Sequence, residues 1–174
     1  MYVHPDAVVH KMASHINPAH AAAFLPFSNG VEWAYRYGEV GLDDAILVQG
    51  PGQQGLACVI AAKAAGASTI IVTGLSQDAR RLEIARKLGA THTIDVQTQD
   101  FTSTIMDITN GRGVDAVVDC TSSHNPIIFL QSIDVMKRRG GIIVTQSYEI
   151  EKLLEIHPFL VSRNLSERAG ISML

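Results

Sequence analysis

The stretch AILVQGPGQQG, residues 45–55, places three glycines directly after a short apolar run. The apolar run predicts a buried strand, and the alanine-rich residues 56–65 predict a helix that follows at once. Gly50 permits a tight turn, Gly52 lets a pyrophosphate approach the backbone, and Gly55 lets the helix pack closely. The amides and positive dipole end of such a helix attract phosphate. The stretch therefore predicts a dinucleotide site, with a plain strand–turn–helix as the alternative.

The composition is that of an ordinary globular protein. The 174 residues are 47% apolar and 18% charged, and the formal net charge is −3. This fits one domain, and the lack of a basic block argues against nucleic acid as a partner. No apolar run approaches the ~18 residues of a membrane span, and the N-terminus does not begin a signal peptide. Cys58 and Cys120 belong to no CxxC pair, so we expect a reduced, cytoplasmic protein.

Short β-branched runs alternate with helical patterns along most of the chain. Strands are predicted over residues 45–49, 69–73, 91–95, 115–119 and 141–145, and further helices over 78–88, 101–109 and 127–137. The strands are almost continuously apolar, as expected of a sheet covered on both faces. This alternation predicts an α/β fold with a doubly wound, Rossmann-type parallel sheet of five to six strands. A sixth strand is expected near Leu165.

The first forty residues follow a different pattern. Residues 18–24 predict a short helix, and a second helix is expected to start near Asn29 and to end by Gly41. We expect residues 1–30 to be a connector segment and residues 31–174 to form the dinucleotide-binding domain.

Several motifs together resemble one enzyme family. They are VQGPGQQGLA (48–57), AAGA (64–67), IVTG (71–74), ARKLGA (85–90), GVDAVVD (113–119) and RGG (139–141). In this order and spacing they resemble the cofactor domain of medium-chain, zinc-type alcohol dehydrogenases and related reductases, over about residues 20–170. The resemblance implies hydride transfer between NAD(P) and a carbonyl or alcohol carbon. It also implies a homodimer, because family members commonly join their sixth strands edge to edge.

The zinc ligands of that family are missing from this sequence. It has neither the Cys nor the Gly-His-Glu segment of the family's catalytic domain, and Leu25 stands at a further ligand position, five residues before Gly30. Leucine cannot bind zinc. His10, His15 and His20 are five residues apart, which does not stack them on one helical face. We therefore expect no metal and no catalytic residue in this chain, which resembles a cofactor-binding half, either a shortened gene product or a piece cut at the domain boundary.

The cofactor contacts implied by the resemblance fall into three groups at the carboxyl ends of the strands, where open α/β sheets bind ligands. The phosphate loop comprises Gly50, Pro51, Gly52, Gln53, Gln54 and Gly55. The second and third strands contribute Thr73, Gly74, Ser76, Arg80, Arg81 and Asp95. Thr121, Ser122, Thr145 and Gln146 follow the fourth and fifth strands, where relatives border the nicotinamide.

The end of the second strand bears on the choice of cofactor. An NAD site places Asp or Glu there to bind the ribose 2′-hydroxyl, whereas this chain has Gly74. Without the acid, Ser76 and either Arg80 or Arg81 can bind a 2′-phosphate. In the alternative, Ser76 or Asp78 caps the next helix and the arginines are solvated. The sequence therefore predicts NADP, with NAD second.

The resulting hypothesis is an NAD(P)(H)-binding domain of an alcohol dehydrogenase-like oxidoreductase that is inactive alone. Two alternatives stay open: a piece of a zinc-independent quinone or enoyl reductase, which suits Leu25, and a non-catalytic NAD(P)-sensing module. A methyltransferase is disfavoured because no acidic residue immediately precedes the glycine loop.

Overall fold

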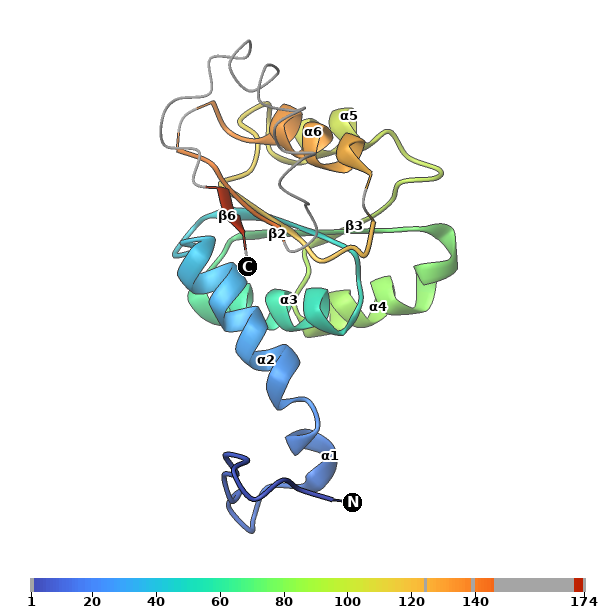
Figure 1. The fold of residues 1–174 in the computed structure, drawn as a ribbon. Coiled ribbons are helices and arrows are strands. Elements are labelled where there is room, and N and C mark those ends of the chain that lie inside the picture. Colours follow the sequence, from blue (N-terminus) through green and yellow to red (C-terminus); the bar gives the residue numbers. More distant parts are fainter. Residues whose placement is uncertain (1, 124, 139, 146–170, 174) are drawn as a thin grey trace.

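A parallel β-sheet forms the centre of the protein (Figure 1). The computed structural model describes residues 2–123, 125–138, 140–145 and 171–173. The strands are β1 (Ala45–Gln49), β2 (Thr69–Gly74), β3 (His92–Asp95), β4 (Ala116–Asp119), β5 (Ile142–Thr145) and β6 (Ile171–Met173). They pair in the order β3-β2-β1-β4-β5-β6, all parallel. This confirms the predicted fold class; Leu165, near which the sixth strand was expected, lies outside the described residues.

Helices cover both faces of the sheet. They are α1 (Pro18–Ala21), α2 (Phe24–Gly30), α3 (Gln53–Ala65), α4 (Ala79–Leu88), α5 (Phe101–Ile108) and α6 (Pro126–Val135), with a π-helical segment η1 (Val31–Tyr37) and a 3-10 turn η2 (Ser76–Asp78). Figure 1 shows α3 and α4 on one face and α5 and α6 on the other. Within the part of the chain that the structure describes, none of the helices has the length and hydropathy that a membrane span requires.

Successive side chains of the strands point to opposite faces of the sheet and pack into two hydrophobic cores. On β1, Ile46 and Val48 pack with Cys58 and Val59 of α3, whereas Leu47 belongs to the core that includes residues of α5 and α6. This follows from the alternation of side chains along a strand. Because both faces are buried, every residue of β1 is buried, as its apolar sequence predicted.

One continuous helix precedes the sheet, and it starts earlier than expected. It begins at Phe24 rather than near Asn29, and runs through Gly30 into η1. A Cβ on Gly30 would lie 2.6 Å from the carbonyl carbon of Ala57, so Gly30 lets α2 touch α3. Ser28, Asn29 and Gly30 are common at helix starts, but here packing against α3 places them inside a helix. The expected division at residue 30 stays a prediction.

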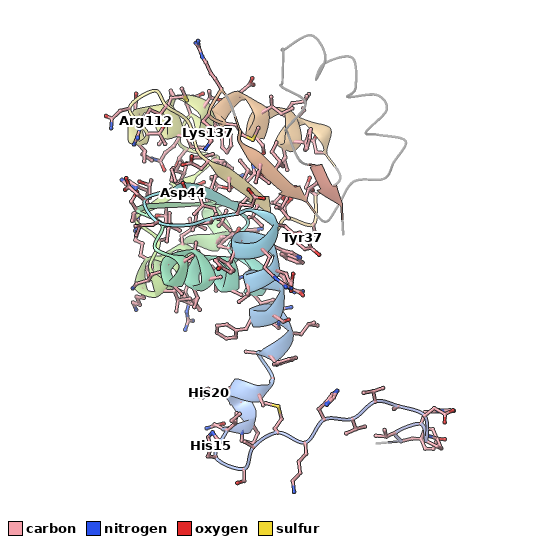
Figure 2. All side chains as sticks on the ribbon, turned by 90° about the vertical axis from the view of Figure 1, so that its left-hand side faces the viewer. His15, His20, Tyr37, Asp44, Arg112 and Lys137 are labelled. Carbon is pink, nitrogen blue, oxygen red and sulfur yellow. The ribbon has the colours of Figure 1, made fainter. Side chains whose placement is uncertain are left out.

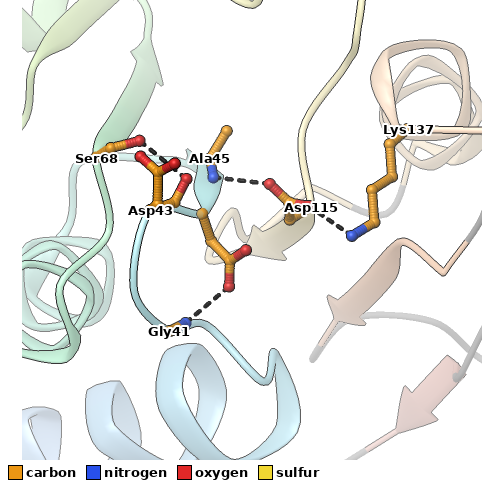
Figure 3. A network of polar contacts seen from close by, with 7 residues as sticks. Gly41, Asp43, Ala45, Ser68, Asp115 and Lys137 are labelled. Carbon is orange, nitrogen blue, oxygen red and sulfur yellow. Dashed lines mark hydrogen bonds and ion pairs between the residues drawn. The ribbon is translucent and has the colours of Figure 1, made fainter.

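Polar contacts close the amino-terminal edge of the sheet (Figure 3). The Asp115 carboxylate accepts hydrogen bonds from the Ala45 amide, at 2.8 Å, and from the Lys137 ammonium group. The Ser68 hydroxyl donates to the carbonyl oxygen of Asp43 at 3.0 Å. These contacts tie the starts of β1, β2 and β4 together.

Candidate dinucleotide-binding site

The candidate site lies where the strand order reverses. The chain goes from β1 to β2 and β3 on one side and then returns to β4 on the other side of β1. Ligands of open α/β sheets bind at such a switch point, beyond the carboxyl ends of the strands. The loops after β1 and β4 contact each other here. A Cβ placed on Gly50 would lie 3.2 Å from the Cys120 carbonyl oxygen and 3.3 Å from Cγ2 of Thr121.

The three loop glycines have three different environments. Gly50 has a φ of +89°, a conformation that L-residues rarely adopt. A Cβ on Gly55 would lie 2.0 Å from the carbonyl oxygen of Gly50, so no side chain fits there. Apart from its chain neighbours, no heavy atom of the described residues lies within 4 Å of a Cβ placed on Gly52. The protein itself thus requires glycine at positions 50 and 55, while the space beside Gly52 is open to a ligand.

The N-terminus of α3 presents unused backbone donors to that space. Gly52 is the N-cap residue, and its carbonyl oxygen accepts from the Leu56 amide at 2.9 Å. The amides of Gln53, Gln54 and Gly55 precede this bond and have no acceptor among the described residues. The amide oxygen of Gln54 is buried and likewise has no partner among them. These groups fit a pyrophosphate and its neighbouring hydroxyl groups.

The carboxyl ends of β2 and β3 bring together the residues predicted for the adenosine side. Gly74 is paired with Asp95 in the sheet, and the Ser76 hydroxyl donates to Asp95 Oδ2 at 2.6 Å. Arg81 forms an ion pair with Asp78 at 3.0 Å. Arg80 is exposed and has no ion pair among the described residues. Of the groups predicted to bind a 2′-phosphate, the Ser76 hydroxyl and Arg81 are therefore held by carboxylates, and Arg80 is not.

Two further contacts bear on residue 74. The Leu75 amide donates to Asp78 Oδ2 at 3.2 Å, so Asp78 closes the 3-10 turn η2. Among the described residues the Asp78 side chain makes no cap hydrogen bond to α4, so this contact is not the helix cap of the alternative interpretation. A Cβ on Gly74 would lie 3.0 Å from Cγ and 3.2 Å from Cδ of Pro51. An acid at position 74 would thus press against a buried residue of the phosphate loop.

The carboxyl end of β4 contains an acid that the sequence analysis did not select. Asp119 is 3% exposed; its Oδ1 accepts from the Thr121 amide at 2.9 Å and from the Thr121 hydroxyl at 2.7 Å. Its Oδ2 is buried without a hydrogen-bond partner among the described residues. Burial raises the pKa of Asp119, and the hydrogen bonds from Thr121 and Thr145 offset this only in part. One feature of the sequence could have pointed to Asp119: it is a charged residue at the end of an otherwise apolar strand.

The other predicted residues of this group lie around Asp119. Thr145 is its partner in the sheet and is buried, whereas Ser122 is exposed. Gln146 lies outside the described residues. The structure thus collects the described candidate residues at one edge of the sheet; their binding roles stay predictions.

The described residues do not fit a zinc ion. They contain no group of three or more His, Cys, Asp and Glu side chains that could hold a metal. His15 and His20 lie on the N-terminal segment that projects away from the sheet (Figure 2), and Leu25 is exposed on α2.

Comparison with known proteins shows the family. Residues 55–169 match the sequence profile described as a zinc-binding dehydrogenase. The chain belongs to this family. As a member of the medium-chain alcohol dehydrogenases, it corresponds to their cofactor-binding portion, and the family uses NAD(P). The predicted resemblance is therefore confirmed.

Individual relatives of this zinc-binding dehydrogenase domain are longer than the chain. It is 36% identical over 144 residues to a probable alcohol dehydrogenase of Mycobacterium tuberculosis, covering 82% of the chain and 39% of that protein. It is 46% identical over 121 residues to a sorbitol dehydrogenase of Bacillus subtilis, covering 70% of the chain and 33% of that protein. The crystal structure of 2R,3R-butanediol dehydrogenase from Bacillus subtilis matches with a TM-score of 0.73 and 26% identity, covering 95% of the chain and 44% of that structure. The chain thus spans less than half the length of each.

Proposed function

We propose that this chain holds NAD(P)(H) for an alcohol dehydrogenase-like oxidoreductase and is inactive alone. The observation that carries the proposal is the loop of residues 50–55. Within the described part of the chain, Gly50 and Gly55 have no room for a side chain, whereas the space beside Gly52 is open and borders α3 amides that have no acceptor. The relatives named above, an alcohol, a sorbitol and a butanediol dehydrogenase, support an alcohol or carbonyl compound as substrate of the whole enzyme.

In this proposal the amides of α3 bind the pyrophosphate, and the ends of β4 and β5 orient the nicotinamide. The bound dinucleotide supplies the hydride donor or acceptor. Thr121 donates two hydrogen bonds to the Asp119 carboxylate, and these fix the loop after β4. We assign no described residue a role as proton donor, which is why we expect no turnover by the chain alone.

The substitution Gly52→Asp tests dinucleotide binding without disturbing the fold. Because the space beside Gly52 is open, we expect a free energy of unfolding that is unchanged or higher by about 0.3 kcal/mol, since Asp is a good N-cap residue. The new carboxylate meets the pyrophosphate, so NADH and NADPH affinity should fall about a hundredfold or more, roughly 3 kcal/mol. Calorimetric titration and urea unfolding measure the two quantities.

A control places negative charge at the opposite edge of the sheet. Arg112 is exposed before β4, and Arg112→Asp lowers the net charge by more than Gly52→Asp does. Its affinity for the dinucleotide should match that of the wild type. Unchanged binding by Gly52→Asp, or no binding by the wild type, would favour the plain structural turn.

We further propose a preference for NADP, carried by Arg80. A charge-assisted hydrogen bond to the 2′-phosphate is worth roughly 1.5–3 kcal/mol, so Arg80→Ala should weaken NADPH binding about ten- to a hundredfold and leave NADH binding unchanged. Arg81→Ala is the matched control, because Asp78 already holds Arg81. A wild type that prefers NADH, with an affinity ratio that Arg80→Ala does not change, would establish NAD as the cofactor.

A second candidate function is a zinc-independent quinone or enoyl reductase, which the leucine at position 25 supports. Elemental analysis of the whole enzyme distinguishes the two, because tightly held zinc in stoichiometric amount would exclude the zinc-independent reductase.

We also propose that the protein works as a homodimer in a reducing, cytoplasmic environment. The sequence has two cysteines and no CxxC pair, which supports the reducing environment.

A further inference from the structure

Two cysteines from different elements meet beneath the glycine loop. Cys58 lies in α3 and Cys120 directly follows β4, 62 residues later, yet their Sγ atoms are only 3.8 Å apart. The chain has two cysteines in total, so this contact brings together all of its thiols.

Both cysteines are connected to the backbone that forms the candidate site. The Cys120 amide donates to the Gln49 carbonyl oxygen at 2.9 Å, and its own carbonyl oxygen packs against Gly50. Cys58 lies about one helical turn beyond the α3 amides of residues 53–55, which have no acceptor among the described residues. The sulfur pair therefore joins the helix that presents the amides to the strand end that supports the loop.

We propose that Cys58 and Cys120 are a reversible oxidation site, which closes to a disulfide and thereby weakens dinucleotide binding at the loop of residues 50–55. The effect on binding rests on the proposed function, whereas formation of the disulfide does not.

The oxidant of the proposal is a small-molecule disulfide. Cys120 is partly exposed and Cys58 is fully buried, so Cys120 reacts first. Its thiolate attacks one sulfur of the small disulfide, whose S–S bond breaks; a mixed disulfide forms and one small thiol leaves, taking up a proton. Cys58 then attacks Sγ of Cys120, the protein disulfide forms, and the second small thiol leaves with the proton of Cys58. Two protein thiols are oxidised and one small disulfide is reduced.

The surroundings of Cys58 and Cys120 make disulfide formation slow, and they transmit its effect to the glycine loop. The hydrogen bond with Cys58 and burial raise the pKa of Cys120, so little thiolate exists at neutral pH and the rate should increase with pH. A disulfide bond is about 2.05 Å long, so the sulfur atoms must approach by about 1.8 Å. Packed interiors transmit such a displacement. At the N-terminus of α3, Gly55 and the Gly50 carbonyl have no spare room to absorb it.

The test equilibrates the full chain with graded ratios of reduced and oxidised glutathione. Mass spectrometry without reductant should show a loss of two hydrogen atoms per chain and a peptide that links residues 58 and 120. Calorimetry of the same samples should show the affinity for the tighter of NADH and NADPH falling about tenfold or more, with recovery after reduction.

Single Cys58→Ala and Cys120→Ala variants serve as controls. Each should bind the dinucleotide like the reduced wild type and form no protein disulfide. Cys120→Ala should lose the reaction with oxidised glutathione, whereas Cys58→Ala should stop at the glutathione adduct on Cys120. Two free thiols or a lasting glutathione adduct at the most oxidising ratio would overturn the oxidation site, and a disulfide with unchanged affinity would overturn its coupling to the loop. If the reduced wild type binds neither dinucleotide, the proposed function fails, while the mass measurement still decides whether the disulfide forms.

Discussion

At the scale of single residues, the buried carboxyl of Asp119 links the candidate site to pH. Its pKa in the folded protein is raised by burial above the ordinary value of 3.8, which applies to the unfolded chain. Between these two values the folded state binds more protons, so the free energy of unfolding falls as pH rises through this window. The stabilising contribution of the protonated Asp119 is fully present below 3.8 and is lost above the raised pKa.

We therefore expect Asp119→Asn to gain stability relative to the wild type as pH rises from 3.8, because asparagine cannot ionise. Urea unfolding at a series of pH values measures the difference. Asp100→Asn is a control of opposite sign, because hydrogen bonds from Ser103 lower the pKa of Asp100. The contribution of Asp100 is present above 3.8 and is lost as pH falls below it. A pH-independent difference for Asp119→Asn would contradict the shift.

The loop glycines could be predicted from sequence alone, whereas the environments of Asp119 and Ser76 could not. The backbone needs of Gly50 and Gly55 follow from the lack of a Cβ, a property of the residue type that local sequence reveals. The burial of Asp119, by contrast, depends on which side chains surround it in the folded chain. Likewise, the hydrogen bond from Ser76 to Asp95 joins residues that follow or end two different strands, so local sequence does not reveal that the hydroxyl already has an acceptor.

At the scale of elements, the crossing of α2 and α3 depends on Gly30. Helix propensity alone predicts that Gly30→Ala stabilises the helix by up to ~1 kcal/mol. The new Cβ would lie 2.6 Å from the Ala57 carbonyl carbon, so we expect a net loss of about 1–3 kcal/mol instead. Urea unfolding gives the sign. Gly41→Ala is the control, because its Cβ meets only Asp44 Oδ2, at 3.7 Å; equal or higher stability of Gly30→Ala would disprove the tight crossing.

Helices and strands could be predicted where a local sequence pattern determines them, and not where a tertiary contact does. The strands β1 to β5 were located to within one residue, because short β-branched runs buried on both faces leave a strong sequence pattern. The start of α2 was predicted five residues too late, since polar residues next to a glycine normally mark a helix N-terminus. Contact with α3, a tertiary feature, overrides that local signal.

At the scale of the whole molecule, exposed apolar surface favours association. Phe24, Leu25 and Phe27 are 67%, 64% and 44% exposed on α2. Beside them, α2 and α3 border a mainly apolar groove of about 480 Å³. We expect a dimer in sedimentation experiments, in which this surface or the edge of the sheet at β6 is covered.

The double substitution Phe24→Ser/Leu25→Ser separates these two interfaces. Both side chains are exposed, so the fold should be unaffected, and the dimer dissociation constant should rise about tenfold or more if α2 is the interface. An unchanged constant would assign the dimer to the sheet edge. A strictly monomeric wild type at high concentration would refute association altogether.

The contact between Pro51 and Gly74 limits how cofactor preference can evolve. In NAD sites an acid at the position of Gly74 accepts a hydrogen bond from the ribose hydroxyl. Here the Cβ of such an acid would lie 3.0 Å from Cγ of the Pro51 ring. The ring fixes φ of Pro51, so the loop cannot easily turn away. The Pro51 ring must therefore move by a few tenths of an ångström before residue 74 can carry a side chain. We expect the effect of an acid at position 74 to depend on which residue occupies position 51, so that the order in which the two positions change affects the stability of the intermediate.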